Sequence, residues 1–170
     1  GYTMPLPEKD EMFITKGQLL QDIMVSLGGR IAEEIIFGDI TTGASSDIKK
    51  ATSAARDMVT RYGMSENIGV INYNSDDDEV FIGRDLAHAK NHSELISGEI
   101  DREVKAIIDD CYKKAKDIIL AHMDVLHHCA ELLIVKEKIG REEFEALFDQ
   151  KENDPESFFK NHEISESAQT

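Results

Sequence analysis

Residues 15–38 read TKGQLLQDIMVSLGGRIAEEIIFG, and this stretch predicts the first helix of the fold. Thr15 and Gln18 have the spacing of a capping box, in which the threonine hydroxyl accepts an early helix N–H and the glutamine reaches back to the cap. Gly38 is a natural C-terminal stop. Between the two ends, apolar residues recur at helical spacing: Leu19, Ile23, Leu27, Ile31 and Ile35. We therefore expect an amphipathic helix whose two ends are both encoded locally.

Two adjacent glycines, Gly28 and Gly29, interrupt this helical pattern. Each glycine in a helix interior costs about 1 kcal/mol relative to alanine. The simplest reason to retain both is the close approach of another backbone, so we expect tight packing at this point.

The remaining apolar patterns predict more helices. Ser45 or Ser46 can cap a second helix that ends before Gly63, and a long helix is expected from about residue 92 to residue 121. Asp124 can cap the next helix, and a short last helix is expected over residues 141–148.

Two short runs, residues 68–73 and 80–82, are instead typical of β-strands. The predicted fold class is therefore mainly α, an antiparallel helical bundle with a small β element or flap. We expect one domain over residues 1–149, followed by an acidic and disordered tail over residues 150–170.

Charge and hydropathy exclude some classes of partner. Acidic residues outnumber basic residues by 34 to 19 in the 170-residue chain, giving a formal charge of -15. That charge repels phosphate backbones, so nucleic acid is not an expected partner. No run approaches the roughly 18 apolar residues that span a bilayer, so we expect this piece to be soluble. Cys111 and Cys129 stand singly in apolar patterns and are expected to be core residues.

Asp47 has two interpretations on the residues alone. It follows the small residues 41–46 and falls in the first turn of a predicted helix, where the helix dipole favours an acidic side chain. The residues alone favour this role, a solvated acidic side chain in the first turn of a helix. The alternative is a metal ligand, because a carboxylate on a rigid helix start can be aimed at a cation.

Histidine spacing offers weaker candidates. His88 and His92 are separated by the four-residue step that lets two imidazoles share one helix face, but Ala89 stands where a catalytic glutamate would be needed. His127 and His128 are adjacent and point about 100° apart on a helix, so one should be exposed and one partly buried. The chain contains neither a G-x-x-x-x-G-K-[ST] loop nor a G-x-S-x-G elbow.

Four stretches together resemble the proteolytic domain of the FtsH family of membrane-anchored AAA zinc metalloproteases. They read LGGRIAEEIIFG at residues 27–38, TGASSDI at 42–48, YGMSE at 62–66 and DVLH at 124–127. Their order and spacing match over roughly residues 1–149. In that family a largely helical, hexameric peptidase follows a membrane-spanning segment and an ATPase module. Its zinc is held by both histidines of an H-E-x-x-H helix and by a distant aspartate.

The resemblance implies roles for individual residues. The distant aspartate corresponds to Asp47, which becomes the expected zinc ligand. Glu33 lies on the helix that the family packs beside the metal helix, so it could orient a zinc-bound histidine without touching the metal. Gly1, Tyr2 and Thr3 resemble the strand that borders the cleft, where an extended polypeptide substrate could add by main-chain hydrogen bonds.

The sequence departs from the family in one respect, since H-E-x-x-H occurs nowhere in its 170 residues. We therefore expect an excised piece without peptidase activity or tight zinc binding of its own. The expected parent is an ATP-dependent zinc metalloendopeptidase that degrades membrane and soluble proteins. It would sit as a homo-hexamer in the bacterial inner membrane, or alternatively an organellar one, with its peptidase domain facing the cytoplasm and ATP bound elsewhere. A different class of function is a non-catalytic helical assembly module.

Overall fold

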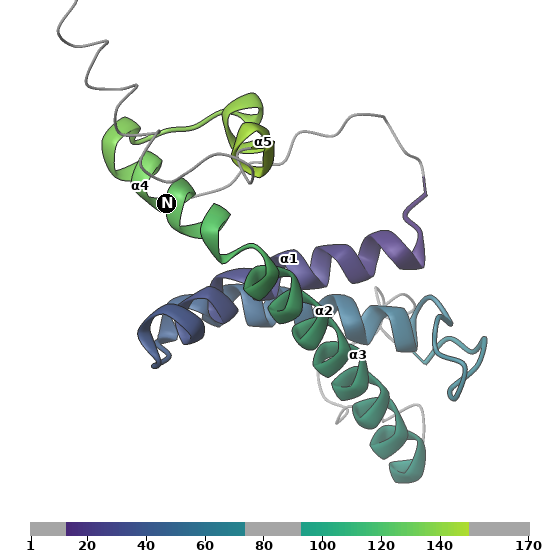
Figure 1. Ribbon diagram of the computed structural model, residues 1–170. Coiled ribbons are helices and arrows are strands. Elements are labelled where there is room, and N and C mark those ends of the chain that lie inside the picture. Colours follow the sequence, from purple (N-terminus) through teal and green to yellow (C-terminus); the bar gives the residue numbers. More distant parts are fainter. Residues whose placement is uncertain (1–12, 74–92, 150–170) are drawn as a thin grey trace, which may run out of the picture. The chain divides into compact units, whose positions relative to one another are not determined.

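A computed structural model describes residues 13–73 and 93–149, and the described chain is built from helices (Figure 1). The predicted substrate strand (residues 1–3), the histidine pair (88 and 92) and the predicted tail (150–170) lie outside the described residues. The chain divides into two compact units, residues 1–118 and 119–170.

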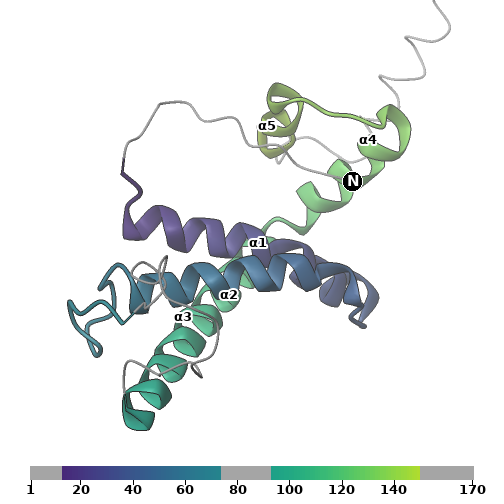
Figure 2. The same ribbon diagram turned by 180° about the vertical axis from the view of Figure 1, so that it is seen from behind.

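The described residues of the first unit form three long helices. Helix α1 (Lys16–Phe37) and helix α2 (Ser45–Thr60) run antiparallel and side by side, as both views show (Figures 1 and 2). A short 3-10 turn, η1 (Thr42–Ala44), leads into α2. Helix α3 (Glu94–Ala121) contributes all but its last residues to this unit. The predicted mainly α fold is confirmed.

Both predicted ends of α1 are confirmed. Thr15 Oγ1 accepts the N–H of Gln18 at 3.2 Å, and Gln18 Oε1 accepts the N–H of Thr15 at 2.7 Å, which completes the capping box. At the other end Gly38 adopts φ 64°, and its N–H donates to the carbonyl of Glu34 at 3.0 Å. A left-handed residue at this position reverses the chain after the last helical turn.

The start of α2 differs from the prediction. Neither Ser45 nor Ser46 is the cap, because α2 follows Ala44, which makes no side-chain capping bond. The hydroxyl that accepts a free N–H lies further upstream, where Thr41 Oγ1 accepts from Gly43 at 3.1 Å. The 3-10 turn runs directly into the helix, so the cap belongs to the turn and not to α2 itself.

Apolar side chains from all three helices form the core of the first unit. The buried side chains that are fully or almost fully enclosed include Ile23, Leu27 and Ile31 of α1, Ala55, Met58 and Val59 of α2, and Ile100, Val104 and Cys111 of α3. Burial of a large aliphatic side chain contributes about 1.5–3 kcal/mol. Apolar burial therefore holds α1, α2 and α3 together, and it also raises the pKa of the Cys111 thiol.

The expected close packing at Gly28 and Gly29 is not present. A methyl group added at either glycine would meet no atom within 4 Å apart from the neighbouring backbone of α1 itself. Both lie outside the buried stripe of α1, on the side that carries Ile36 and Val25. Val25 is 78% exposed. We call this side, with its four residues, the open face of α1. Within the described residues nothing approaches the glycines closely.

The first β-prone run is not a strand. Residues 68–73 form turn, bend and irregular backbone. Ile68 is buried, but its backbone is not part of a strand. Gly63 and Gly69, at φ 61° and 81°, bend the chain on either side of the loop start. Tyr73 N–H donates to the carbonyl of Thr60 at 2.7 Å and fixes the loop beside α2. The second run, residues 80–82, lies outside the described residues.

The second unit is a helical hairpin of α4 (Met123–Lys136) and α5 (Arg141–Asp149). Among its described residues, Val125, Leu132 and Leu147 are buried, and Cys129 and Ile139 pack against them. The helix starts after His122, so Asp124 stands in the first turn and the prediction that it caps α4 was wrong. As predicted for adjacent histidines, His127 is exposed and His128 is partly buried.

Across residues 13–73 and 93–149, no one helix combines the length and the apolar composition needed to cross a membrane. Among the described helices, α3 and α4 pass the test of length and composition only when they are taken as a pair, and a break in the helix separates them.

Candidate metal-ligand site

Asp47 lies in the first turn of α2, as the sequence predicted. Its side chain is 45% exposed, and Oδ1 accepts from the ammonium of Lys50 at 3.2 Å. Lys50 is 69% exposed, so this ion pair is screened by water and contributes little to stability. The carboxylate therefore keeps access to solvent and can exchange its partner.

The chain just before Asp47 is held by a group of polar contacts centred on Thr41. Glu33 Oε1 accepts from Thr41 Oγ1 at 2.6 Å, and Glu33 Oε2 accepts from the Thr41 N–H at 3.2 Å. Arg30 Nη1 donates to the Thr41 carbonyl at 3.0 Å. The same threonine hydroxyl accepts from Gly43, so the N–H, the carbonyl and the hydroxyl of Thr41 are all engaged. We call these four residues the Thr41 clamp.

The clamp lowers the pKa of the Glu33 carboxyl below its usual value. The largest causes are the two hydrogen bonds from Thr41, and the positive charge of Arg30 adds to them. Glu33 is therefore a carboxylate at neutral pH, and both of its oxygens accept bonds from the loop. That Glu33 also orients a zinc-bound histidine stays a prediction.

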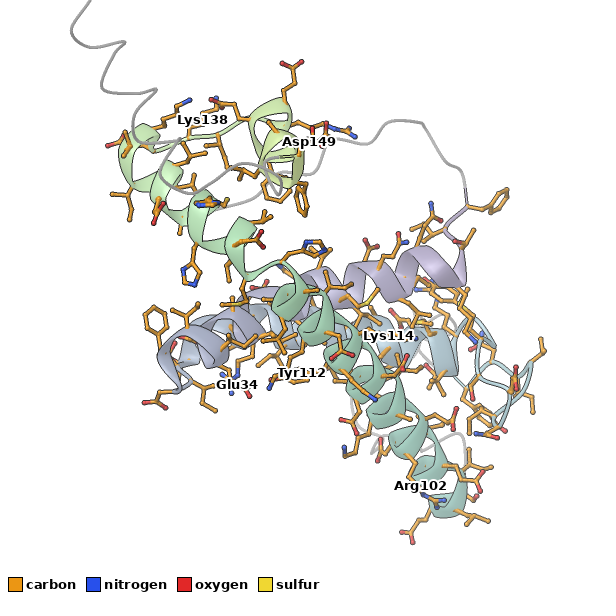
Figure 3. The ribbon with its side chains drawn as sticks, viewed as in Figure 1. Glu34, Arg102, Tyr112, Lys114, Lys138 and Asp149 are labelled. Carbon is orange, nitrogen blue, oxygen red and sulfur yellow. The ribbon has the colours of Figure 1, made fainter. Side chains whose placement is uncertain are left out.

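The neighbouring carboxylate, Glu34, points to a different partner. Its Oε1 accepts from Lys116 Nζ at 2.9 Å, and its Oε2 accepts from the hydroxyl of Tyr112 (Figure 3). These bonds lower the pKa of Glu34 and raise that of Tyr112. Successive glutamates of α1 thus fix two segments, with Glu33 holding the loop to α2 and Glu34 holding α3.

Zinc in a catalytic site takes three protein ligands and leaves one position for water or substrate. Within the described ranges no group of three His, Cys, Asp or Glu side chains converges on one point. Asp47 has the features of a single ligand, because its carboxylate is accessible and lies in the first turn of a helix. Lys50 would have to release Oδ1 or leave the second oxygen to the metal.

Sequence reasoning singled out Asp47 and Glu33, whose roles at a metal stay predictions, but it did not single out Arg30 or Thr41. A signal was present, because Arg30 and Glu33 stand one helical turn apart near the end of α1 and can reach the same loop residue. The pairing with Thr41 itself depends on how the chain turns at Gly38, which sequence spacing does not define.

Comparison with known proteins places this chain in a class. The description "Peptidase family M41" matches residues 1–147. The chain therefore belongs to peptidase family M41.

Its relatives are more specific. It is 50% identical over 147 residues to the ATP-dependent zinc metalloprotease FtsH of Caldicellulosiruptor bescii, which covers 86% of this chain and 24% of that protein. It is 48% identical over 148 residues to FtsH 1 of a Thermoanaerobacter species, covering 87% of this chain and 24% of that protein. FtsH of Thermotoga maritima is 42% identical over 147 residues, covering 86% and 24%. The resemblance to FtsH-type proteases is confirmed, and the chain spans about a quarter of these relatives.

Proposed function

We propose that this chain is the C-terminal part of the proteolytic domain of an ATP-dependent zinc metalloendopeptidase, and that Asp47 is one of its zinc ligands. The observation that carries the proposal is the position of Asp47. In a chain matched to peptidase family M41, it stands in the first turn of α2 with an accessible carboxylate.

The residues of this chain would bind and orient. Asp47 supplies a negative oxygen ligand, and the fixed start of α2 limits where that oxygen can lie. When bound in a complete site, zinc supplies Lewis acidity, which activates water and polarises a peptide carbonyl. Glu33 would act from outside the ligand set, either through the loop it holds or through a histidine.

We propose that the remaining ligands and the general base come from a part of the protein outside these 170 residues. The open face of α1 supports this, because Val25 and Ile36 are exposed beside two glycines that leave room for a closely packed helix. On this proposal the chain alone neither cleaves peptides nor binds zinc tightly.

The wider setting is proposed from the family resemblance. The complete protein would be a homo-hexamer anchored in the bacterial inner membrane by an N-terminal segment, with the peptidase domain in the cytoplasm. ATP would be used by a separate ATPase domain. Membrane and soluble polypeptides would be the substrates, and Gly1, Tyr2 and Thr3 would pair with their backbones.

Casein digestion by the complete protein tests this proposal. We expect cleavage that requires ATP, stops with a zinc chelator and is lost in Asp47→Ala. The isolated 170-residue chain should show no cleavage with or without added zinc. Full casein cleavage by Asp47→Ala would remove Asp47 from the site. A complete protein with no H-E-x-x-H motif upstream of Gly1 would instead favour a non-catalytic assembly module.

A further inference from the structure

We propose that Thr41 is a positioning residue for Asp47, and that through Arg30 and Glu33 it ties the direction of the Asp47 carboxylate to helix α1. This inference rests on the proposed function of Asp47 as a zinc ligand. It adds a device that family resemblance did not suggest, because neither Arg30 nor Thr41 entered the predicted site.

The connection between α1 and α2 lacks apolar anchoring. No residue of η1 is buried, and Ile40 is half exposed. A connection without buried side chains is normally the least ordered part of a helical hairpin. The bonds to Thr41 replace that missing anchor, since they join its N–H, its carbonyl and its hydroxyl to α1 and to the turn.

Backbone hydrogen bonds connect Thr41 to the helix turn that carries Asp47. The hydroxyl of Thr41 accepts from Gly43 inside η1. The N–H of Ser45, the first residue of α2, donates to the carbonyl of Thr42. Asp47 lies two residues further on in the first helical turn, so clamp, turn and helix start form one hydrogen-bonded path.

The Thr41 clamp should matter more for metal binding than for stability. Its bonds are on the surface, so they change the free energy of unfolding little. A metal ligand, however, must be held within about 0.5 Å of its productive position. Loss of a partner that orients a metal ligand typically reduces metal affinity about 10- to 100-fold. Disrupting the Thr41 clamp should therefore weaken metal affinity while changing the free energy of unfolding very little.

The test uses the complete protein and measures zinc affinity by competition with a chromophoric chelator. Thr41→Val keeps the side-chain shape and removes the hydroxyl, and we expect it to weaken zinc about 10-fold. Thr41→Ser restores the hydroxyl and should bind within about twofold of wild type, because it leaves the orienting bond in place. Thr52→Val is the matched control, since Thr52 Oγ1 donates to the carbonyl of Ile48 within α2 and touches no clamp residue.

Two further readouts separate orientation from folding. Cobalt(II) in place of zinc gives visible absorption bands that depend on ligand number and geometry, and these should shift in Thr41→Val but not in Thr52→Val. In the 170-residue chain, the Gly43 amide should exchange its hydrogen faster in Thr41→Val because its acceptor is gone.

Each outcome decides one claim. If Asp47→Ala keeps its zinc, the proposed function fails first. If Asp47→Ala loses zinc while Thr41→Val binds it like wild type, the proposed function stands and the positioning role of Thr41 is wrong. Equal weakening by Thr41→Ser and Thr41→Val would also overturn it. Should Thr41→Val fail to fold, Glu33→Gln takes its place, and unchanged zinc affinity there would contradict the clamp.

Discussion

The two connections that flank α2 are held by the same chemistry in different surroundings. Before α2, Glu33 accepts two bonds from Thr41 in a turn without buried residues. After α2, Glu103 accepts from Ser65 Oγ and Asn67 Nδ2, both at 2.6 Å, in a loop where Ser65 and Ile68 are each only 7% exposed. A carboxylate clamp on the surface orients the chain, whereas one beside the core also stabilises the fold.

The largest expected effect on stability is at Gly63, near the start of the connection that follows α2, which we call the second connection. Its φ of 61° disfavours any side chain, and an added methyl group would lie 3.0 Å from Val70 Cα. We expect Gly63→Ala to lower the free energy of unfolding by about 3 kcal/mol in urea titrations of this chain.

Gly38 is the matched control for Gly63. It has φ 64° but open space around an added methyl group, so Gly38→Ala should lower the free energy of unfolding by only about 1 kcal/mol. Equal losses at the two glycines would show that the contact with Val70 is unimportant.

Ser65 should come next. Its hydroxyl donates to Glu103 and accepts from the N–H of Ile68 at 3.2 Å, so Ser65→Ala removes both bonds and leaves the buried N–H of Ile68 without that acceptor. We expect a loss of about 1–2 kcal/mol in the free energy of unfolding. Ser53→Ala, at an exposed position of α2, should stay within about 0.5 kcal/mol. Similar values for both variants would contradict the distinction between the two connections.

Acid should weaken the second connection through Glu103. The hydrogen bonds from Ser65 and Asn67 lower the pKa of Glu103 below its usual 4.5. Because the folded-state pKa is the lower one, the stabilisation is complete above about pH 4.5 and is lost as the pH falls through the folded-state value. Glu103→Gln should therefore show a shallower fall in urea midpoint below pH 4.5 than wild type. Part of the fall in urea midpoint should persist in Glu103→Gln, because the pKa values of Glu33 and Glu34 are also lowered. Parallel curves would contradict the role of Glu103.

The smallest expected effect on stability is at Thr41. Thr41→Val in the isolated chain should change the free energy of unfolding by no more than about 0.5 kcal/mol, because the two bonds it breaks, from the hydroxyl to Glu33 and from Gly43 to the hydroxyl, are both at the surface. Thermal unfolding followed by circular dichroism measures this. A loss as large as that of Ser65→Ala would mean that the Thr41 clamp is a stabilising anchor like the second connection.

The sequence predicted features whose cause is local. Thr15, Gln18 and Gly38 define the ends of α1 within a few residues, and both ends are confirmed. The start of α2 was missed because its turn is capped by Thr41, outside the expected Ser45 and Ser46. The Thr41 clamp was missed because it joins residues eight to eleven positions apart across a chain reversal.

Gly28 and Gly29 show a different limit. Their pattern correctly indicated a helix, but the expected close neighbour is not among the described residues. A small-residue face indicates that packing is possible there without naming the partner. Asp47 stands between these cases, since its place in the first turn of α2 is local while its role as a ligand came from resemblance.

The central claim is tested most directly by the zinc content of the complete protein in two first-turn variants. Asp47 and Asp124 occupy the first turns of α2 and α4, so Asp47→Asn and Asp124→Asn remove the same favourable interaction with a helix dipole. Only Asp47→Asn removes the proposed ligand. We predict stoichiometric zinc in wild type and Asp124→Asn, and a clear loss of zinc in Asp47→Asn after dialysis. Equal zinc content in all three proteins would contradict the assignment of Asp47.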